Sequence, residues 1–192
     1  MKIQTAQHYT CEEIVALSRQ WVETIVVGLN LCPFAAPVVR NDTLRYAVTD
    51  AESMEALASN FLQELNLIQE KEEKEIATTL VIMPRAVSDF YDYLDLLAYF
   101  EDLLAKSGLS GVFQLASFHP AYLFAGVEPD DLSHWTNRSP FPMVHIIREG
   151  QMSRVLTHYD NPEEIPERNI KLLRELGREG LVERFPPFAD FI

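Results

Sequence analysis

The sequence predicts an α/β (or α+β) fold: a single layered domain with a sheet of about four strands flanked by helices, and extra helices at both ends. Two observations predict it. Segments with helical periodicity alternate along the chain with short runs of apolar and β-branched residues. The chain has 192 residues, 47% of them hydrophobic and 23% charged, which allows a sizeable core without disulfides or bound metal. We expect one domain over 1–192, with its core at about 10–177 and an aromatic tail at 178–192.

The first element is a helix that begins at a capping box, Thr10-x-x-Glu13. Its apolar face recurs at helical spacing and includes Ile14, Trp21 and Ile25. Gly28 stands where a C-cap glycine is expected to end the helix. The loop that follows, GLNLCPFAAPVVR (28–40), is apolar and rich in proline.

Residues 43–49 (TLRYAVT) alternate as in a strand. Asp50 is expected to cap the next helix, whose apolar face extends to Ile68 and which ends in a solvated charge run and turn at 69–76. The nearly continuous apolar run ATTLVIMP (77–84) is typical of a buried central strand. A third helix then starts at Ser88 or Asp89 and closes at Lys106 and Gly108.

The sequence GVFQLASFHP (111–120) predicts the third strand, and an irregular segment with a short helix fills 121–142. Residues 143–149 predict a fourth strand whose direction is left open, followed by a short helix at 150–159. The last helix has start signals at Asn161-Pro162 and Pro166, and Gly177 is expected to end it. The aromatic tail is expected to pack on the domain or on a second subunit as a homo-oligomer.

The charge of the chain excludes several classes of partner. Its formal net charge is −13, with 16 Lys and Arg against 29 Asp and Glu and no basic cluster, so neither nucleic acid nor an anionic membrane is an expected partner. The N-terminus has no apolar signal region, and no apolar run is long enough to span a bilayer. A cytoplasmic protein is predicted.

The two cysteines predict no disulfide. Cys11 and Cys32 lie at opposite ends of the first helix. About 17 helical residues at ~1.5 Å each separate them by ~25 Å, whereas a disulfide requires Cα atoms within about 7 Å. Both cysteines are therefore expected to be reduced.

The common catalytic and nucleotide-binding motifs are missing. The sequence contains no G-x-G-x-x-G, Walker loop, G-x-S-x-G, C-x-x-C or H-E-x-x-H, and only 7 glycines. Classical nucleotide binding and serine hydrolase chemistry are not expected, and no cofactor is implied.

Cys32 and His119 are the candidate catalytic residues. Cys32 precedes Pro33 and could cap a helical turn whose N–H groups would favour its thiolate, although a small buried hydrophobe is the simpler interpretation. His119 ends a strand, where sites of layered folds collect, and could be a base, an anion donor or a metal ligand, or simply bond a carbonyl. His145, within a strand, is interpreted as a satisfied core histidine.

A second group of residues is suited to holding an anionic small molecule. Arg138 lies between aromatic residues and prolines, where a guanidinium can fork onto a carboxylate or phosphate, and a structural salt bridge would explain it equally well. Arg168 falls in the first turn of the last helix, where free N–H groups favour anions, or where a charged turn simply faces water. The candidate substrate-binding residues are Asn30, Asn137, Arg138, Ser139, Arg168 and Asn169.

Four motifs in order, LNLCPFA, LASFHPAYLFAG, NRSPFPMVHIIRE and IPERNIKLLRELG, carry a resemblance to a known family. The chain resembles the bacterial family called domain of unknown function 1415 from about Trp21 to Gly177. The resemblance implies a bacterial, cytoplasmic context and transfers no activity, cofactor or catalytic residue.

Three functional hypotheses remain open from the sequence. The first is a small-molecule enzyme with Cys32 as nucleophile or ligand, His119 as base, and Arg138 with Arg168 anchoring an anionic substrate. The second is a metal site built from Cys32 and His119, with or without His145, although their large separations lack the paired spacing of structural zinc sites. The third is a non-catalytic binding or oligomerising protein with an inert Cys32.

Overall fold

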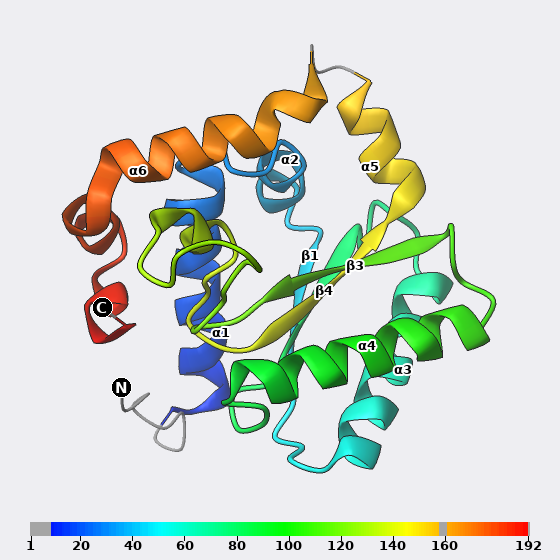
Figure 1. The fold of residues 1–192 in the computed structure, drawn as a ribbon. Helices are drawn as coiled ribbons and strands as arrows, with labels where there is room; N and C mark the ends of the chain where they lie inside the picture. Colours follow the sequence, from blue (N-terminus) through cyan, green and yellow to red (C-terminus); the bar gives the residue numbers. More distant parts are fainter. Residues whose placement is uncertain (1–8, 158–160, 192) are drawn as a thin grey trace.

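A computed structural model describes residues 9–157 and 161–191 of the chain. Its element order alternates helices and strands through the middle of the chain and ends in helices, as Figure 1 shows. The helix–strand alternation predicted from periodicity is therefore confirmed.

Four strands form one mixed sheet in the order β1-β2-β4-β3. The strands are β1 (Leu44–Val48), β2 (Thr78–Ile82), β3 (Phe113–Phe118) and β4 (Met143–Arg148). β1 and β2 are parallel, while β4 is antiparallel to both of its neighbours. The last strand thus inserts between two strands that precede it in the sequence, which decides the direction that the sequence left open.

Two helices cover one face of the sheet, α3 (Met54–Glu70) and α4 (Phe90–Lys106) (Figure 1). Phe61 of α3 stacks on Phe100 of α4 with ring centroids 4.3 Å apart. The buried hydroxyl of Tyr93 donates to the Met143 carbonyl (2.7 Å) and accepts from the Phe118 amide (3.0 Å). Aromatic packing and these hydrogen bonds fill this side of the sheet.

The other face of the sheet is covered by the two ends of the chain (Figure 1). Its elements are α1 (Cys11–Trp21), the π-helical segment η2 (Val22–Val27), α2 (Ala35–Arg40), α5 (Glu149–Leu156) and α6 (Ile165–Arg184). Trp21, Phe34 and Leu173 are among the buried residues that pack them together. The terminal helices expected from the sequence therefore cover this face of the sheet and form a second core with it.

The predicted helix starts are partly confirmed. Thr10 forms the capping box with Glu13, and Asp89 caps α4. Asp50 was the wrong cap for α3, because Thr49 Oγ1 accepts a hydrogen bond from the Ala51 amide and holds this segment in a turn. Ser53 caps the helix instead.

Gly28 is the C-cap residue at the end of η2, as expected, but it is not left-handed. Its φ is −61°, and Asn30, two residues later, has the positive φ of 51°. The Gly28 amide bonds to the Glu23 carbonyl at the wider π-helical spacing. A Cβ at Gly28 would lie 2.3 Å from the Thr24 carbonyl oxygen, so glycine is needed there for a close approach of backbone.

Gly177 ends the first helix of α6, as expected, because its φ of 71° and ψ of 175° are not helical. A second short helix follows this kink and continues to Arg184. The last turn, η5 (Pro186–Phe191), places Phe188 edge-on to Trp135 at 4.6 Å. Phe185 and Phe188 are fully buried, so the aromatic tail packs on its own chain.

The irregular segment contains the expected short helix, η3 (Leu132–Thr136), and α5 matches the helix predicted at 150–159 as far as Leu156. Residues 158–160 lie outside the described residues. The 3-10 turn η4 (Pro162–Glu164) leads into α6. Across the described chain, no helix has the length and apolar composition needed to cross a bilayer.

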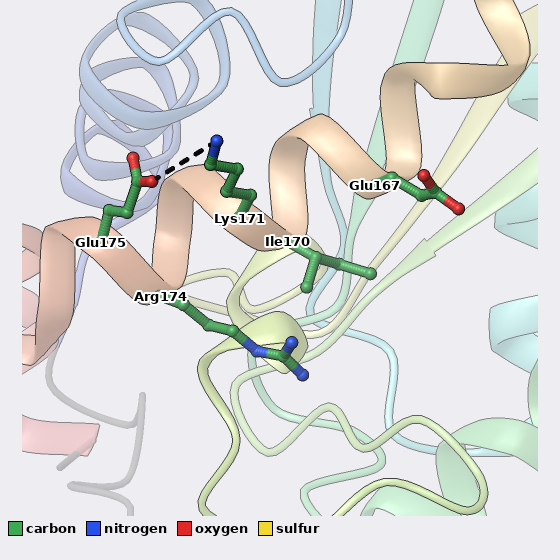
Figure 2. Close-up of a pocket in the computed structure, with 5 residues that line it drawn as sticks. All are labelled: Glu167, Ile170, Lys171, Arg174 and Glu175. Carbon is green, nitrogen blue, oxygen red and sulfur yellow. Dashed lines mark ion pairs between the residues drawn. The ribbon is translucent and has the colours of Figure 1, made fainter.

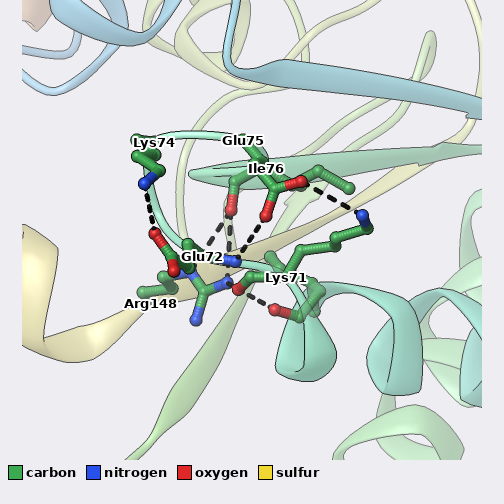
Figure 3. A network of polar contacts seen from close by, with 7 residues as sticks. Lys71, Glu72, Lys74, Glu75, Ile76 and Arg148 are labelled. Atoms are coloured by element: carbon green, nitrogen blue, oxygen red, sulfur yellow. Dashed lines mark hydrogen bonds and ion pairs between the residues drawn. The ribbon is translucent and has the colours of Figure 1, made fainter.

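Arg148 closes the charged turn between α3 and β2, as Figure 3 shows. Its guanidinium donates to the carbonyls of Ile68, Lys71 and Ile76. The turn itself carries the ion pairs Lys71–Glu75 (3.1 Å) and Lys74–Glu72 (2.8 Å). This half-buried arginine therefore has partners for its charge and acts as a structural clamp.

Candidate functional site

A small apolar pocket lies between the sheet and the helices of its α1 face. Its cavity volume is about 50 Å³, room for a few water-sized groups or for one end of a larger molecule. It is lined by Trp21, Val22, Val26, Cys32, Phe34, Ala35, Val38, Leu44, Leu80, Phe118 and His145. Cys32 and His145 are the lining residues with reactive side chains, and the others are apolar or aromatic.

The loop between η2 and α2 positions Cys32. Backbone N–H groups at Phe34 and Ala35 favour the Cys32 thiolate, but α2 begins at Ala35 with Phe34 as its N-cap and has no side-chain cap, so Cys32 does not cap this helix as expected. Burial nevertheless raises the pKa of Cys32, and those N–H groups only partly oppose it. The resting cysteine is therefore a neutral thiol, not the thiolate that the capping argument favoured.

His145 reaches the pocket from the central strand β4. Its Nε2 lies 2.5 Å from Thr78 Oγ1, and that hydroxyl donates to the Ile146 carbonyl at 2.6 Å. Because the single hydroxyl proton is used on the carbonyl, Nε2 must carry the proton that Thr78 accepts. The lone pair then resides on Nδ1, which has no hydrogen-bond partner among the described residues.

Desolvation lowers the pKa of His145 to about 3. The ring is half-buried and lines only an apolar pocket, where an imidazolium would lose its hydration without gaining a carboxylate. His145 is therefore neutral at physiological pH and available as a hydrogen-bond acceptor. The interpretation as a satisfied core histidine is correct for one of its two nitrogens.

Aromatic rings pack beside His145 on the pocket wall. Trp21 meets Phe118 edge-on at 5.3 Å, and the Phe118 ring lies 6.3 Å from that of His145. Within the described part of the chain, no hydrogen bond connects the Cys32 thiol to His145 directly. Both residues line the same pocket. Val22 and Val26 on its wall belong to η2, and π-helical turns occur frequently at functional sites.

The structure does not bring His119 to Cys32. The His119 ring lies beside Phe90 (5.4 Å) and Tyr93 (5.1 Å) in the core under α4, on the other side of the sheet. Its Nδ1 accepts from the Ala121 amide and its Nε2 donates to the Val87 carbonyl, both at 3.0 Å. Desolvation lowers its pKa. His119 thus joins two loops through backbone hydrogen bonds, as the structural alternative proposed.

Asn30, Arg168 and Asn169 come together, and their contacts hold the backbone before Cys32. Arg168 donates to the Asn30 carbonyl (2.5 Å) and to Asn169 Oδ1 (3.0 Å). The buried amide of Asn169 donates to the Leu31 carbonyl (2.7 Å). These residues do not line the pocket. They connect α6 to the loop that presents the thiol.

Asn137 and Ser139 also bond to backbone. Asn137 Nδ2 donates to the Ser117 carbonyl (2.9 Å), and the Asn137 carbonyl accepts from the His119 amide (3.1 Å). Ser139 Oγ donates to the Phe141 carbonyl (2.6 Å). They anchor the loop between η3 and β4 to the end of β3.

Arg138 lies outside the apolar pocket. Its guanidinium stacks over the Trp135 ring at 4.8 Å, and its Nε reaches the Tyr122 carbonyl at the long distance of 3.4 Å. None of the carboxylates that the structure describes forms an ion pair with it. The salt bridge offered as its structural explanation is therefore not found among those residues.

A wider hollow of about 540 Å³ runs along the surface of α6 (Figure 2). Lys171 pairs with Glu175 (3.9 Å), while Arg174 reaches Asp131 of the preceding loop (2.7 Å). Arg174 holds the pKa of Asp131 well below its usual range. The paired charges and open shape make this hollow a weaker candidate than the apolar pocket.

The metal hypothesis needs three ligands in one place. Over residues 9–157 and 161–191, no three His, Cys, Asp or Glu side chains are grouped as such a site requires. Cys32 and His145 share the pocket, but His119 packs into the other core. Both cysteines are free, in agreement with the predicted lack of a disulfide.

The pairing of His145 with Cys32 in one pocket, and the contact of His145 with Thr78 behind it, are what the sequence did not predict. Strand alternation places His145 on the same face as Met143 and Ile147, which is readable from the sequence. That this face is the one covered by the Cys32 loop is not readable, because it depends on how the helices pack on the sheet.

Comparison with known proteins returns one family. A family model described as "Protein of unknown function (DUF1415)" matches residues 13–183, a longer stretch than the one that carries the resemblance in the sequence. No curated protein and no solved structure matches the chain. Since the family model covers most of the 192 residues and includes the whole pocket, the chain belongs to the DUF1415 family.

Proposed function

We propose that this protein is a small-molecule enzyme in which Cys32 is the nucleophile and His145, in place of the expected His119, is the base. The single observation that carries the proposal is that both side chains line one apolar pocket while Thr78 fixes the proton of His145 on Nε2. A nucleophile, a base and a third group that orients the base form the arrangement used in thiol catalysis.

The proposed step starts from two neutral groups. The Cys32 sulfur forms a bond to an electrophilic carbonyl carbon of the substrate, and the thiol proton moves to Nδ1 of His145. The carbonyl π electrons move to the substrate oxygen. When that oxygen re-forms the carbonyl, the leaving group departs with the proton from the imidazolium. Thr78 stabilises the imidazolium by accepting from Nε2 throughout.

The character of the pocket supports an uncharged substrate. Burial keeps both Cys32 and His145 neutral, and the remaining wall residues carry apolar or aromatic side chains. A charged group would lose its hydration there without an opposite charge as compensation. The anionic substrate expected from the sequence depended on Arg138 and Arg168, which do not line this pocket.

Alkylation of Cys32 by iodoacetamide tests the proposal. The assay uses a Cys11→Ser background, because Cys11 is exposed, and follows the modified mass of the native protein. We expect His145→Gln to slow alkylation at least about tenfold, since a positioned base contributes at least this much. His119→Gln is the matched control and should change the rate by less than about twofold.

The pH profile separates this mechanism from simple thiolate chemistry. A free thiol reacts about tenfold faster per pH unit below its pKa. If His145 takes the proton, the rate should be nearly flat from pH 5 to 8, because neither group titrates in that range. Cys32 that reacts only after unfolding, or equally fast in His145→Gln, would instead favour a pocket that binds a small apolar molecule without chemistry.

A further inference from the structure

A second site is suggested by Arg138, at the junction of η3 and α6. Its half-buried guanidinium stacks on Trp135, which η3 holds against Phe188 of the C-terminal turn. The contact with the Trp135 ring holds the guanidinium carbon at a defined place beside η3. Arg138 is therefore a positioned, half-buried cation and not a fully exposed one.

The guanidinium of Arg138 lacks partners within the described chain. Nε has one long contact, to the Tyr122 carbonyl at 3.4 Å, and no carboxylate forms an ion pair with the guanidinium. Arg148, equally half-buried, donates to three carbonyls. Arg45 has both oxygens of Glu64, at 2.6 and 2.9 Å. A desolvated guanidinium without such partners is energetically costly unless a ligand supplies them.

A second cation lies close enough to act on the first. Burial lowers the pKa of Arg138, and the charge of Arg178 on α6 lowers it further. In the described structure, Arg178 is exposed and has no hydrogen-bond or ion-pair partner of its own. Two cations that act on each other, neither with an ion pair in the described structure, are unexpected in a chain with a net charge of −13 unless an anion joins them.

We propose that Arg138 and Arg178 bind an oxyanion, the carboxylate or phosphate group of a small molecule. The planar fork of Arg138 matches two oxygens of either group, and Arg178 adds a second positive charge. The hollow on α6 that Arg178 shares with Glu179 and Glu183 is acidic, and Arg138 does not line it. The anion is therefore placed against Arg138 and Trp135.

Titration calorimetry of the full chain with inorganic phosphate, and separately with acetate at equal ionic strength, tests the proposal. We expect saturable binding of at least one anion, weakened about tenfold or more in Arg138→Gln and less in Arg178→Gln. Arg40→Gln removes the same charge from an exposed arginine without a partner in the described structure and should change affinity by less than about twofold.

Phosphate binding without acetate binding would assign the site to a phosphate group, and binding of both to oxyanions in general. Arg138→Lys keeps the charge but not the fork, so it should restore only part of the affinity.

Equal affinities in Arg138→Gln and Arg40→Gln, or no saturable binding of either anion, would overturn the proposal. If Arg138→Gln does not fold, as seen by circular dichroism, the exposed Arg178→Gln decides the question. The Cys32 alkylation rate does not depend on this outcome.

Discussion

The two sides of the sheet hold their histidines in different ways. Under α3 and α4, His119 uses both ring nitrogens on backbone groups, and aromatic rings pack around it. On the α1 side, His145 uses one nitrogen on Thr78 and lines a pocket that also contains Cys32. Both imidazoles are neutral through desolvation, so the difference lies in whether a ring nitrogen is left without a hydrogen-bond partner among the described residues. That unused acceptor, and not burial itself, is why the proposed function uses His145 and not His119.

Removing a phenylalanine from each side should give the largest difference. Phe61→Ala empties the centre of the filled core, where the ring stacks on Phe100, and should cost about 3–5 kcal/mol of unfolding free energy. Phe34→Ala should cost less, because this ring already borders the pocket and has fewer neighbours to lose. Urea unfolding measures both. An equal or larger loss for Phe34→Ala would show that the two sides are equally well packed.

Acid should destabilise the fold through its neutral histidines. Below the unfolded pKa of about 6.5, the unfolded chain takes up protons that folded His145 and His119 refuse. The contribution of these histidines to the free energy of unfolding is therefore fully present above pH ~6.5. It falls as the pH drops, by up to about 1.4 kcal/mol per pH unit for each histidine.

For His145 this loss continues toward its folded pKa of about 3. Urea unfolding at pH 7, 6 and 5 should show a shallower decline in His145→Gln than in the wild type. Parallel declines would mean that His145 takes up its proton in the folded state, contrary to its apolar surroundings.

The bonds from α6 to the Cys32 loop should have unequal effects. Asn169→Ala removes the donor of the buried Leu31 carbonyl and should cost about 1–3 kcal/mol. Arg168→Gln, whose bond to the Asn30 carbonyl is exposed, should cost about 1 kcal/mol or less. Thermal unfolding compares the two. If Asn169→Ala does not change the thermal unfolding, the bonds from α6 do not stabilise this loop.

Small enlargements should give the smallest effects, of opposite sign on the two sides. Ala35→Val adds two carbons at the wall of the pocket and should be neutral or stabilise by up to about 1 kcal/mol. Ala58→Val makes the same change in buried α3 and should cost about 1–3 kcal/mol through overpacking. A destabilising Ala35→Val would indicate that the pocket has no room for added groups.

The elements of this fold were readable because their signals are local. The capping box at Thr10, the cap at Asp89 and the apolar run of β2 each depend on residues within a few positions of one another. Gly28 at the C-cap of η2 and Gly177 at the kink of α6 likewise mark helix ends through local backbone geometry. The second helix of α6 was not predicted, and it depends on the distant core in which Leu181 is buried.

The candidate site was only partly readable. Cys32 was identified from its neighbours, but its partner was not, since His119 and His145 both lie on or at the end of strands and their faces are set by pairing. Arg168 and Asn169 suggested a ligand because their carbonyl partners lie 138 positions away, in the Cys32 loop. A polar side chain that serves a distant backbone is indistinguishable, in sequence, from one that serves a ligand.

By itself, the sequence determined the succession of helices and strands, the absence of a disulfide and the family. The tertiary structure decided that β4 inserts antiparallel between β2 and β3, which face of the sheet each histidine joins, and that Cys32 stays a thiol. The physical reason is the distance along the chain over which each effect acts. Capping and periodicity act over a few residues, whereas burial, which fixes the protonation of Cys32 and His145, depends on every element that packs around them.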